Sequence, residues 1–349
     1  MAYETTAACG YELTTSGTFK EVHLPIASPR PDDIVAAVHL VGICGSDLGV
    51  YLGRHPYKRA PAVLGHEMCG HVVAVGSGVS RVRVGDHITT SAFCPCGSCS
   101  QCSGGMVNLC AGRTNLSHED WPGCFATHVV LREPMITVLP HDMPHEQGTL
   151  VEPLSIAWHA LQRPDTRPQH VAVIGAGGIG AATVLLAHRA GATKVTAIDR
   201  GVAKERLARK LGASCFLDAG DLDDRAKYTD VNADLTVVTS GHPSCLTEAL
   251  ELTRPRGQVV VVSYSGSDVS IPLDGFVGNE ITLLTSHLAV GSEVEEIVTM
   301  LSNGLDASRL ITHRFPIHDV EAAFDLLTSP EGVSAGRVVL ENRLKEDLR

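Results

Sequence analysis

Aromatic residues and positive charge are both scarce in this 349-residue chain. Phenylalanine, tryptophan and tyrosine together supply 4% of the residues, and 28 lysines and arginines stand against 39 aspartates and glutamates. The resulting net charge of -11 repels phosphate backbones and acidic membrane surfaces, and no long basic run offsets it. Nucleic acids and membranes are therefore not expected as partners.

The chain also lacks the signals of an exported or membrane-inserted protein. Residues 1–10 contain no basic residue and no apolar block, and the most apolar stretch, 171–187, is interrupted by glycines. A cytoplasmic protein is therefore expected. In such a reducing compartment, eleven cysteines favour metal-binding or reactive thiols over a disulfide framework.

Hydrophobic patterning divides the chain into two kinds of region. From 21 to 132, short β-type runs alternate with Gly, Pro and Asp turns, which predicts a mostly antiparallel β region. From 171 to 285, strands alternate with helices, which predicts a doubly wound parallel sheet. Amphipathic helices at 292–302 and 319–328 and a last strand at 337–340 are expected to fold back onto the first region.

A glycine-rich motif lies between the first strand and the first helix of the alternating region. Gly175, Gly177 and Gly180 form G-x-G-x-x-G, with Gly178 and Ile179 as the two residues before the last glycine. The first glycine permits a tight turn, the second admits a pyrophosphate, and the third lets helix and strand pack closely. The motif predicts a dinucleotide site at the start of the helix.

An acidic residue strengthens this prediction. Asp199 lies 19 residues past Gly180, at the end of the next predicted strand, where a carboxylate can accept hydrogen bonds from the adenosine ribose. The same charge would repel a 2′-phosphate, which favours NAD over NADP. Arg200 is either a solvent-exposed cation at a helix start or a contact to cofactor phosphate.

A cluster of cysteines predicts a structural zinc site. Cys96, Cys99, Cys102 and Cys110 have the spacing C-x2-C-x2-C-x7-C, and four thiolates in so short a loop can surround zinc with no position left open. Cys94 is an alternative first ligand, but the two equal x2 steps favour Cys96.

Three separate segments carry donors of the kind that hold a catalytic zinc. They contribute Cys44, the pair His66 and Glu67, and Glu152. A thiolate, an imidazole and carboxylates from different segments suit a zinc that keeps one position for water or substrate. Each segment alone is a weak signal. The other histidines are expected to have surface or structural roles, among them His39, His55, His71, His87, His118 and His159.

The order of these motifs resembles the zinc-containing medium-chain dehydrogenases over essentially the whole chain. The sorbitol, threonine and cyclitol dehydrogenases are nearer than liver-type alcohol dehydrogenase, because Glu152 stands where a second cysteine ligand would match. The resemblance implies a GroES-like, mostly β catalytic domain formed by 1–154 and 289–349. It also implies a Rossmann NAD-binding domain at 155–288, and a homodimer or homotetramer.

The resemblance also implies roles at the catalytic zinc. Cys44 and His66 would be direct ligands, and Glu67 and Glu152 compete for the remaining protein position. Ser46 would take the proton of a substrate hydroxyl whose pKa the zinc lowers, while hydride passes from the carbinol carbon to the nicotinamide. Gly49 stands where many members of the family have a histidine, which leaves the outer part of the proton relay open.

The expected activity is NAD-dependent oxidation of a polyol, sugar or cyclitol hydroxyl, aminocyclitols included, with two zinc ions per chain. An alternative within the same fold is reduction of an aldehyde, an imine or a conjugated carbonyl compound. An alternative of another class is a non-catalytic NAD-binding protein, for which an incomplete open zinc site would be the signature.

Overall fold

The structure is a computed structural model that describes residues 8–26, 29–118, 121–266 and 268–342. The chain forms two compact units. The first consists of the described residues within Met1–Glu152, Val290–Pro330 and Arg337–Arg349, and the second of those within Pro153–Ala289 and Glu331–Gly336.

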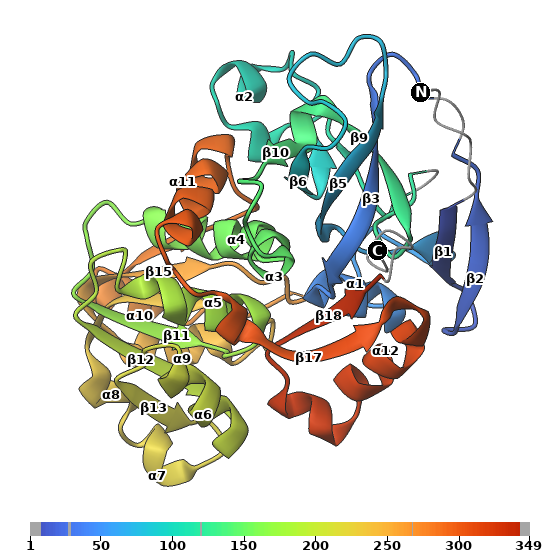
Figure 1. The fold of residues 1–349 in the computed structure, drawn as a ribbon. Helices are drawn as coiled ribbons and strands as arrows, with labels where there is room; N and C mark the ends of the chain where they lie inside the picture. The colour runs from blue at the N-terminus through green and yellow to red at the C-terminus, as the bar shows by residue number, and fades with distance from the viewer. Residues whose placement is uncertain (1–7, 27–28, 119–120, 267, 343–349) are drawn as a thin grey trace. The chain divides into compact units, whose positions relative to one another are not determined.

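The first unit is rich in β-strands, as the sequence predicts (Figure 1). Its strands are β1 (Ala8–Leu13), β2 (Phe19–Leu24), β3 (Asp33–Gly42), β4 (Ala62–Val63), β5 (Glu67–Val75), β6 (His87–Thr90), β7 (Phe93–Cys94), β8 (Thr114–Asn115), β9 (His128–Arg132), β10 (Ile136–Val138), β17 (Ile311–Pro316) and β18 (Arg337–Glu341). The main sheet has the order β10-β6-β5-β3-β18-β17, with β9 also paired to β3, and smaller sheets have the orders β2-β1-β4 and β7-β8. All these pairs are antiparallel except β17 with β18, which is parallel.

Strand β3 is the centre of the main sheet. Nine of its ten residues are buried, and it pairs with β5, β9 and β18. The pairing of β3 with β5 changes register between Val38 and Leu40, so His39 has no opposite residue. At its end, Gly42 pairs with Glu67 of β5 and with Val339 of β18, which brings distant segments of the chain together.

The first unit also contains helices. They are α1 (Gly45–Tyr51), α2 (Ser100–Ser103), η1 (Val107–Leu109), η2 (Glu133–Met135), α3 (His145–Thr149), α11 (Gly291–Ser302), η3 (Ser308–Leu310), η4 (Ile317–Asp319) and α12 (Val320–Thr328). The long helix α4 (Val151–Gln162) starts in the first unit and continues into the second, where η5 (Pro330–Ser334) also lies for most of its length. In the described part of the chain, no helix is both long and apolar enough to span a bilayer.

The second unit confirms the predicted doubly wound parallel sheet. Its strands are β11 (His170–Ile174), β12 (Lys194–Asp199), β13 (Cys215–Asp218), β14 (Ala233–Val238), β15 (Thr253–Val261) and β16 (Thr282–Thr285). They lie in the order β13-β12-β11-β14-β15-β16, and every pair is parallel. The strand order therefore reverses direction between β11 and β14, the position at which sheets of this kind bind ligands.

Helices join these parallel strands. They are α5 (Gly178–Ala187), α6 (Val202–Lys210), α7 (Leu222–Arg225), α8 (Tyr228–Val231), α9 (Cys245–Leu252) and α10 (Leu273–Gly278). Strand β11 is buried at all five positions, and eight of the ten residues of α5 are buried. A continuous apolar run is what a strand covered on both faces requires. This strand and helix hold the glycine-rich turn between them.

Gly180 is the contact point between α5 and the turn that follows β11. A Cβ atom at Gly180 would overlap the carbonyl oxygen of Gly175, whereas a Cβ at Gly177 would meet no atom within 4 Å. We predict that Gly180→Ala lowers the free energy of unfolding by about 1–3 kcal/mol, the usual cost of overpacking. Gly177→Ala, the control, should change it by no more than about 0.5 kcal/mol. Urea unfolding of both variants tests this, and equal stability of the two would contradict it.

Candidate functional site

The first site begins at the N-terminus of α1. Cys44 is the residue before this helix, and its backbone N–H donates to Asp47 Oδ2 at 3.0 Å. The other carboxylate oxygen of Asp47 accepts from the backbone N–H of Gly65 at 3.3 Å and lies 3.7 Å from His66 Nδ1. Asp47 therefore ties the Cys44 segment to the His66 segment.

Glu67 reaches the same place from the first position of β5. Its carboxylate forms a buried ion pair with Arg337, the first residue of β18. A side chain at Gly42 would overlap Glu67 Oε2. The glycine at the end of β3 is therefore what allows the Glu67 carboxylate to lie here.

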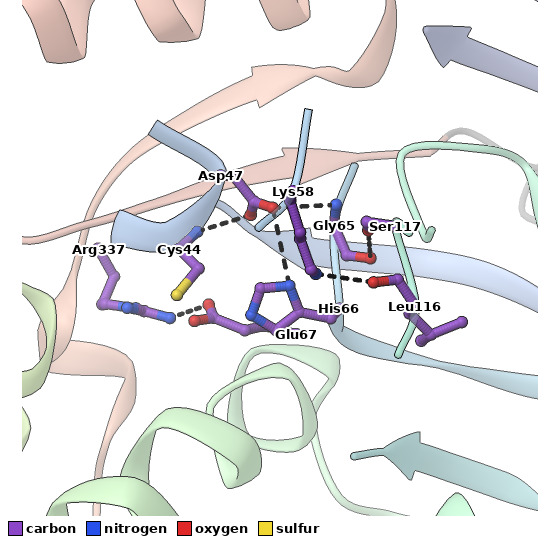
Figure 2. A network of polar contacts seen from close by, with 9 residues as sticks. All are labelled: Cys44, Asp47, Lys58, Gly65, His66, Glu67, Leu116, Ser117 and Arg337. Atoms are coloured by element: carbon purple, nitrogen blue, oxygen red, sulfur yellow. Dashed lines mark hydrogen bonds and ion pairs between the residues drawn. The ribbon is translucent and has the colours of Figure 1, made fainter. Parts of the chain in front are cut away.

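Cys44, His66 and Glu67 converge on one point (Figure 2). One ligand atom from each, namely a sulfur, a ring nitrogen and a carboxylate oxygen, lies within 4.8 Å of the other two. One buried atom of this group, Glu67 Oε1, makes no hydrogen bond within the described part of the chain, whereas His66 Nδ1 faces Asp47. Buried polar groups without partners are rare, and a metal ion is one way to satisfy them.

The charges around this point also fit a divalent cation. Four acidic side chains gather here, Cys44, Asp47, Glu67 and Glu152, and two basic ones, Lys58 and Arg337. With all six ionised, two negative charges are left without compensation. Burying an isolated charge is energetically unfavourable unless the charge is paired or binds a metal. A zinc ion, with its two positive charges, would bring the group to neutrality.

The pKa shifts follow from this crowding. Burial raises the pKa of the Cys44 thiol, and the nearby acidic groups Asp47 and Glu152 raise it further. Burial lowers the pKa of His66 and favours its neutral form, which is the form that binds metals. Burial raises the pKa of Glu152, while His66 opposes that shift. A cation at the centre would reverse the shift of the thiol.

The predicted site residues take different places. Cys44, His66 and Glu67 come together, whereas Glu152, at the second position of α4, is close enough to affect their charges but is not part of the three-residue group. Ser46 is the second residue of α1. A hydrogen bond from its side chain lowers the pKa of the Cys44 thiol.

The predicted zinc lobe also comes together. Cys96, Cys99, Cys102 and Cys110 each place a sulfur within 4.8 Å of the other three. The Cys99 sulfur lies 3.5 Å from that of Cys102 and 3.8 Å from that of Cys110, close to the edge of about 3.8 Å that a zinc tetrathiolate would have from its bond length. The Cys94 sulfur instead lies 3.7 Å from the carbonyl oxygen of Pro95 and is outside the group.

Backbone N–H groups prepare this lobe for thiolates. Hydrogen bonds from the backbone of Ser98 and Cys99 lower the pKa of Cys96 to about 6, and one from the backbone of Cys102 lowers that of Cys99. Burial raises the pKa of Cys102 to about 12. Without a cation, negative charge would therefore be shared unequally among these three sulfurs.

The glycine-rich turn has the backbone that its spacing predicts. Gly175 has φ +92°, which favours glycine, and a Cβ there would lie 2.9 Å from Thr239 Oγ1. Gly177 faces open space and precedes the first turn of α5, which begins with Gly178 and Ile179. Four backbone N–H groups at such a helix start are available to an anion.

Asp199 holds the turn in place. Its carboxylate accepts from the backbone N–H of Ala176 at 2.6 Å and of Arg200 at 2.7 Å, while the side chain of Arg200 is exposed. The buried ammonium of Lys204 donates to the carbonyl oxygen of Ala176 at 3.3 Å. Burial lowers the pKa of Lys204, and Asp199 raises it.

Comparison with known proteins identifies the family. The model of the alcohol dehydrogenase GroES-like domain matches residues 30–141, and that of the zinc-binding dehydrogenase family matches residues 178–303. An L-threonine 3-dehydrogenase of Bacillus subtilis (strain 168) is 32% identical over 94% of this chain and 97% of its own length. This chain belongs to the zinc-binding alcohol dehydrogenase family.

Two further relatives support this placement. A sorbitol dehydrogenase of Bacillus subtilis (strain 168) is 27% identical over 86% of this chain and 88% of its own. The crystal structure of 2R,3R-butanediol dehydrogenase from Bacillus subtilis matches with a TM-score of 0.85 at 25% identity, covering 96% of this chain and 99% of that one. The chain is thus an oxidoreductase of the polyol dehydrogenase branch that acts on CH–OH groups of small molecules. The predicted family, fold and enzyme class are confirmed.

No role is assigned from the sequence to three side chains of this candidate site, Asp47, Lys58 and Arg337. The Cys44-x-x-Asp47 spacing is that of a helix-capping motif, and this signal could have identified Asp47 as the residue that fixes the turn. Lys58, whose ammonium donates to the carbonyl oxygen of Leu116 at 2.7 Å, follows no motif. Arg337 lies 270 residues from Glu67, and the sequence carries no signal that pairs them.

A mutational test decides whether Cys96 or Cys94 is the first ligand of the four-cysteine lobe. We predict that Cys96→Ser lowers the zinc content by about one ion per chain, because a closed tetrahedral site needs all four thiolates. The matched variant Cys94→Ser should keep the zinc content of the native protein. Inductively coupled plasma mass spectrometry of both purified proteins measures the zinc content. Loss of zinc from the Cys94 variant alone would make Cys94, and not Cys96, the first ligand.

Proposed function

We propose that the protein oxidises a secondary hydroxyl of a polyol, sugar or cyclitol to the ketone, with NAD as acceptor and a zinc ion held by Cys44, His66 and Glu67. The convergence of these three ligand atoms within 4.8 Å carries the proposal. Glu152, outside that group, would act through water or by exchange with Glu67. Zinc bound there supplies the positive charge that lowers the pKa of a hydroxyl.

The choice of substrate class rests on the polar character of the site. Threonine at its third carbon and 2R,3R-butanediol, the substrates in the names of two relatives, both have a secondary hydroxyl beside a second polar group. Here Glu152 and Lys58 provide a carboxylate and an ammonium near the ligand group. Such groups can hydrogen-bond a second hydroxyl or an amino group, which favours polyols, cyclitols and aminocyclitols over simple alcohols.

The remaining steps use residues of this chain. Ser46 would take the hydroxyl proton and pass it toward solvent, and a bound NAD would supply the hydride acceptor. The N–H groups at the start of α5 bind the pyrophosphate, and Asp199 binds the adenosine ribose. The thiolates of Cys96, Cys99, Cys102 and Cys110 hold a second zinc with no open position, so its role is structural.

The two units would divide this work, the first as the catalytic domain and the second as the NAD-binding domain. The homodimer or homotetramer and the cytoplasmic location that the sequence suggests stay predictions. Light scattering coupled to size-exclusion chromatography tests the first, and fractionation of cells that produce the protein tests the second.

The test of the activity is NADH formation from a panel of polyols, cyclitols and simple secondary alcohols. We predict turnover of at least one polyhydroxy substrate, with Cys44→Ser lowering kcat/KM at least about 100-fold and removing about one zinc per chain, because a direct ligand is lost. Cys215→Ser, a thiol of the second unit, is the control. Turnover of aldehydes, imines or conjugated carbonyl compounds alone would replace the proposal with the reductase alternative.

The cofactor preference has its own test. We predict that Asp199→Asn improves kcat/KM for NADP relative to NAD by about tenfold or more, a difference of about 1.4 kcal/mol, because the amide no longer repels a 2′-phosphate. The amide oxygen can still accept from the Ala176 N–H. Asp218→Asn, at the end of the neighbouring β13, changes a carboxylate that accepts from Gly201 and Gly220 instead, and should leave the ratio unchanged. An unchanged ratio in both variants would contradict the role of Asp199.

A further inference from the structure

A second group of donors lies on the main sheet of the first unit, apart from both sites described above. Cys69 is on β5, His87 is on the adjacent β6, and His145 begins α3 (Figure 1). One ligand atom from each lies within 4.8 Å of the other two. Thr89 is the cross-strand partner of Cys69, and His71 is that of His87, so the two pairs lie on one ladder with a single pair, Gly70 and Ile88, between them.

Two of the three separations in this group are near those of a coordination shell, and the third is shorter. The Cys69 sulfur lies 2.9 Å from His87 Nε2 and 3.7 Å from His145 Nδ1, and the two nitrogens are 3.3 Å apart. A tetrahedron with zinc–sulfur and zinc–nitrogen bonds of about 2.0–2.3 Å has edges of about 3.3–3.6 Å. Small shifts of these side chains would therefore suffice to bind an ion.

The protonation of His87 suits a metal ligand. Its Nδ1 lies 3.1 Å from the carbonyl oxygen of Pro140, and since a carbonyl only accepts, Nδ1 carries the proton. In the neutral ring, Nε2 then presents its lone pair to Cys69 and His145. A backbone carbonyl that orients a histidine in this way is typical of metal sites.

Neighbouring groups hold the other donors in place. A side chain at Gly148 would overlap the Cys69 sulfur, so the glycine is what lets α3 lie against this thiol. The ring of His39 stacks on that of His145, with centroids 4.5 Å apart, and the ring of His71 stacks on that of His87 at 4.8 Å. His71 Nδ1 and His39 Nε2 are 2.9 Å apart.

We propose that Cys69, His87 and His145 form a third metal site, which binds zinc(II). A thiolate with two imidazoles suits a transition-metal ion of borderline softness, unlike magnesium or calcium, which prefer oxygen ligands. On binding, the Cys69 thiol gives up its proton to solvent, both histidines stay neutral, and water completes the shell. His145 is partly exposed and leaves a way in for the ion.

The site would link the two segments that supply carboxylates to the catalytic centre. Cys69 lies two residues after Glu67 on β5, and His145 lies seven residues before Glu152, at the start of the helix that precedes α4. An ion bound to both segments restrains one against the other. The role is therefore structural support of the neighbouring catalytic site.

The test is the zinc content of the full-length protein after removal of metal, refilling with zinc chloride and gel filtration. We expect three ions per chain in the native protein and two in Cys69→Ala and in His145→Gln. The controls are Cys245→Ala, a buried thiol of the second unit, and His128→Gln, a partly buried histidine of β9, and both should retain three. Since His145 is partly exposed, its variant serves if Cys69→Ala fails to fold.

A cobalt(II) titration gives an independent readout. The third equivalent should add a thiolate-to-cobalt charge-transfer band in the native protein that is missing in Cys69→Ala and present in Cys245→Ala. Two zinc ions in the native protein, or three in both Cys69→Ala and His145→Gln, would overturn the proposal. Because Cys44→Ser and Cys96→Ser report on the other two sites, a loss there is distinguishable from a loss here.

Discussion

A crowd of acidic side chains at the end of β3 is the constraint on which the candidate site of the first unit depends. Cys44, Glu67 and Glu152 come from separate segments of the chain, and each adds an acidic group to one half-buried or buried region. Lys58 and Arg337 offset only part of this charge. The fold can bring the acids together because a divalent cation completes the balance.

In each unit, a glycine without a side chain makes room for a close contact beside a turn. Gly42 has no side chain, so the Glu67 carboxylate can lie against β3, and Gly180 has none, so α5 can lie against the turn after β11. A carboxylate then fixes each turn through backbone N–H groups, Asp47 at Cys44 and Asp199 at Ala176. In both units, the backbone conformation of the turn therefore determines where the side chains of the candidate site lie.

The features that could be predicted from the sequence are those whose residues lie close together in the chain. The dinucleotide turn and the four-cysteine lobe are continuous in sequence, so their geometry follows from the intervals between residues. The parallel sheet was predicted from alternating strands and helices. Arg337 meets Glu67 across 270 residues because β18 and β5 both pair with β3, and Cys69 meets His145 across 76 residues because α3 packs near β5. Such contacts need the topology, which single motifs do not contain.

The most direct test of the central claim is an anomalous diffraction map recorded at the zinc edge from crystals of the zinc-loaded protein. The account predicts a peak bonded to Cys44 Sγ, a ring nitrogen of His66 and a carboxylate oxygen of Glu67 at about 2.0–2.3 Å, with Glu152 farther away. A map without density there, while the four-cysteine lobe holds its ion, would contradict it. The buried charge would then have to be balanced by protonation.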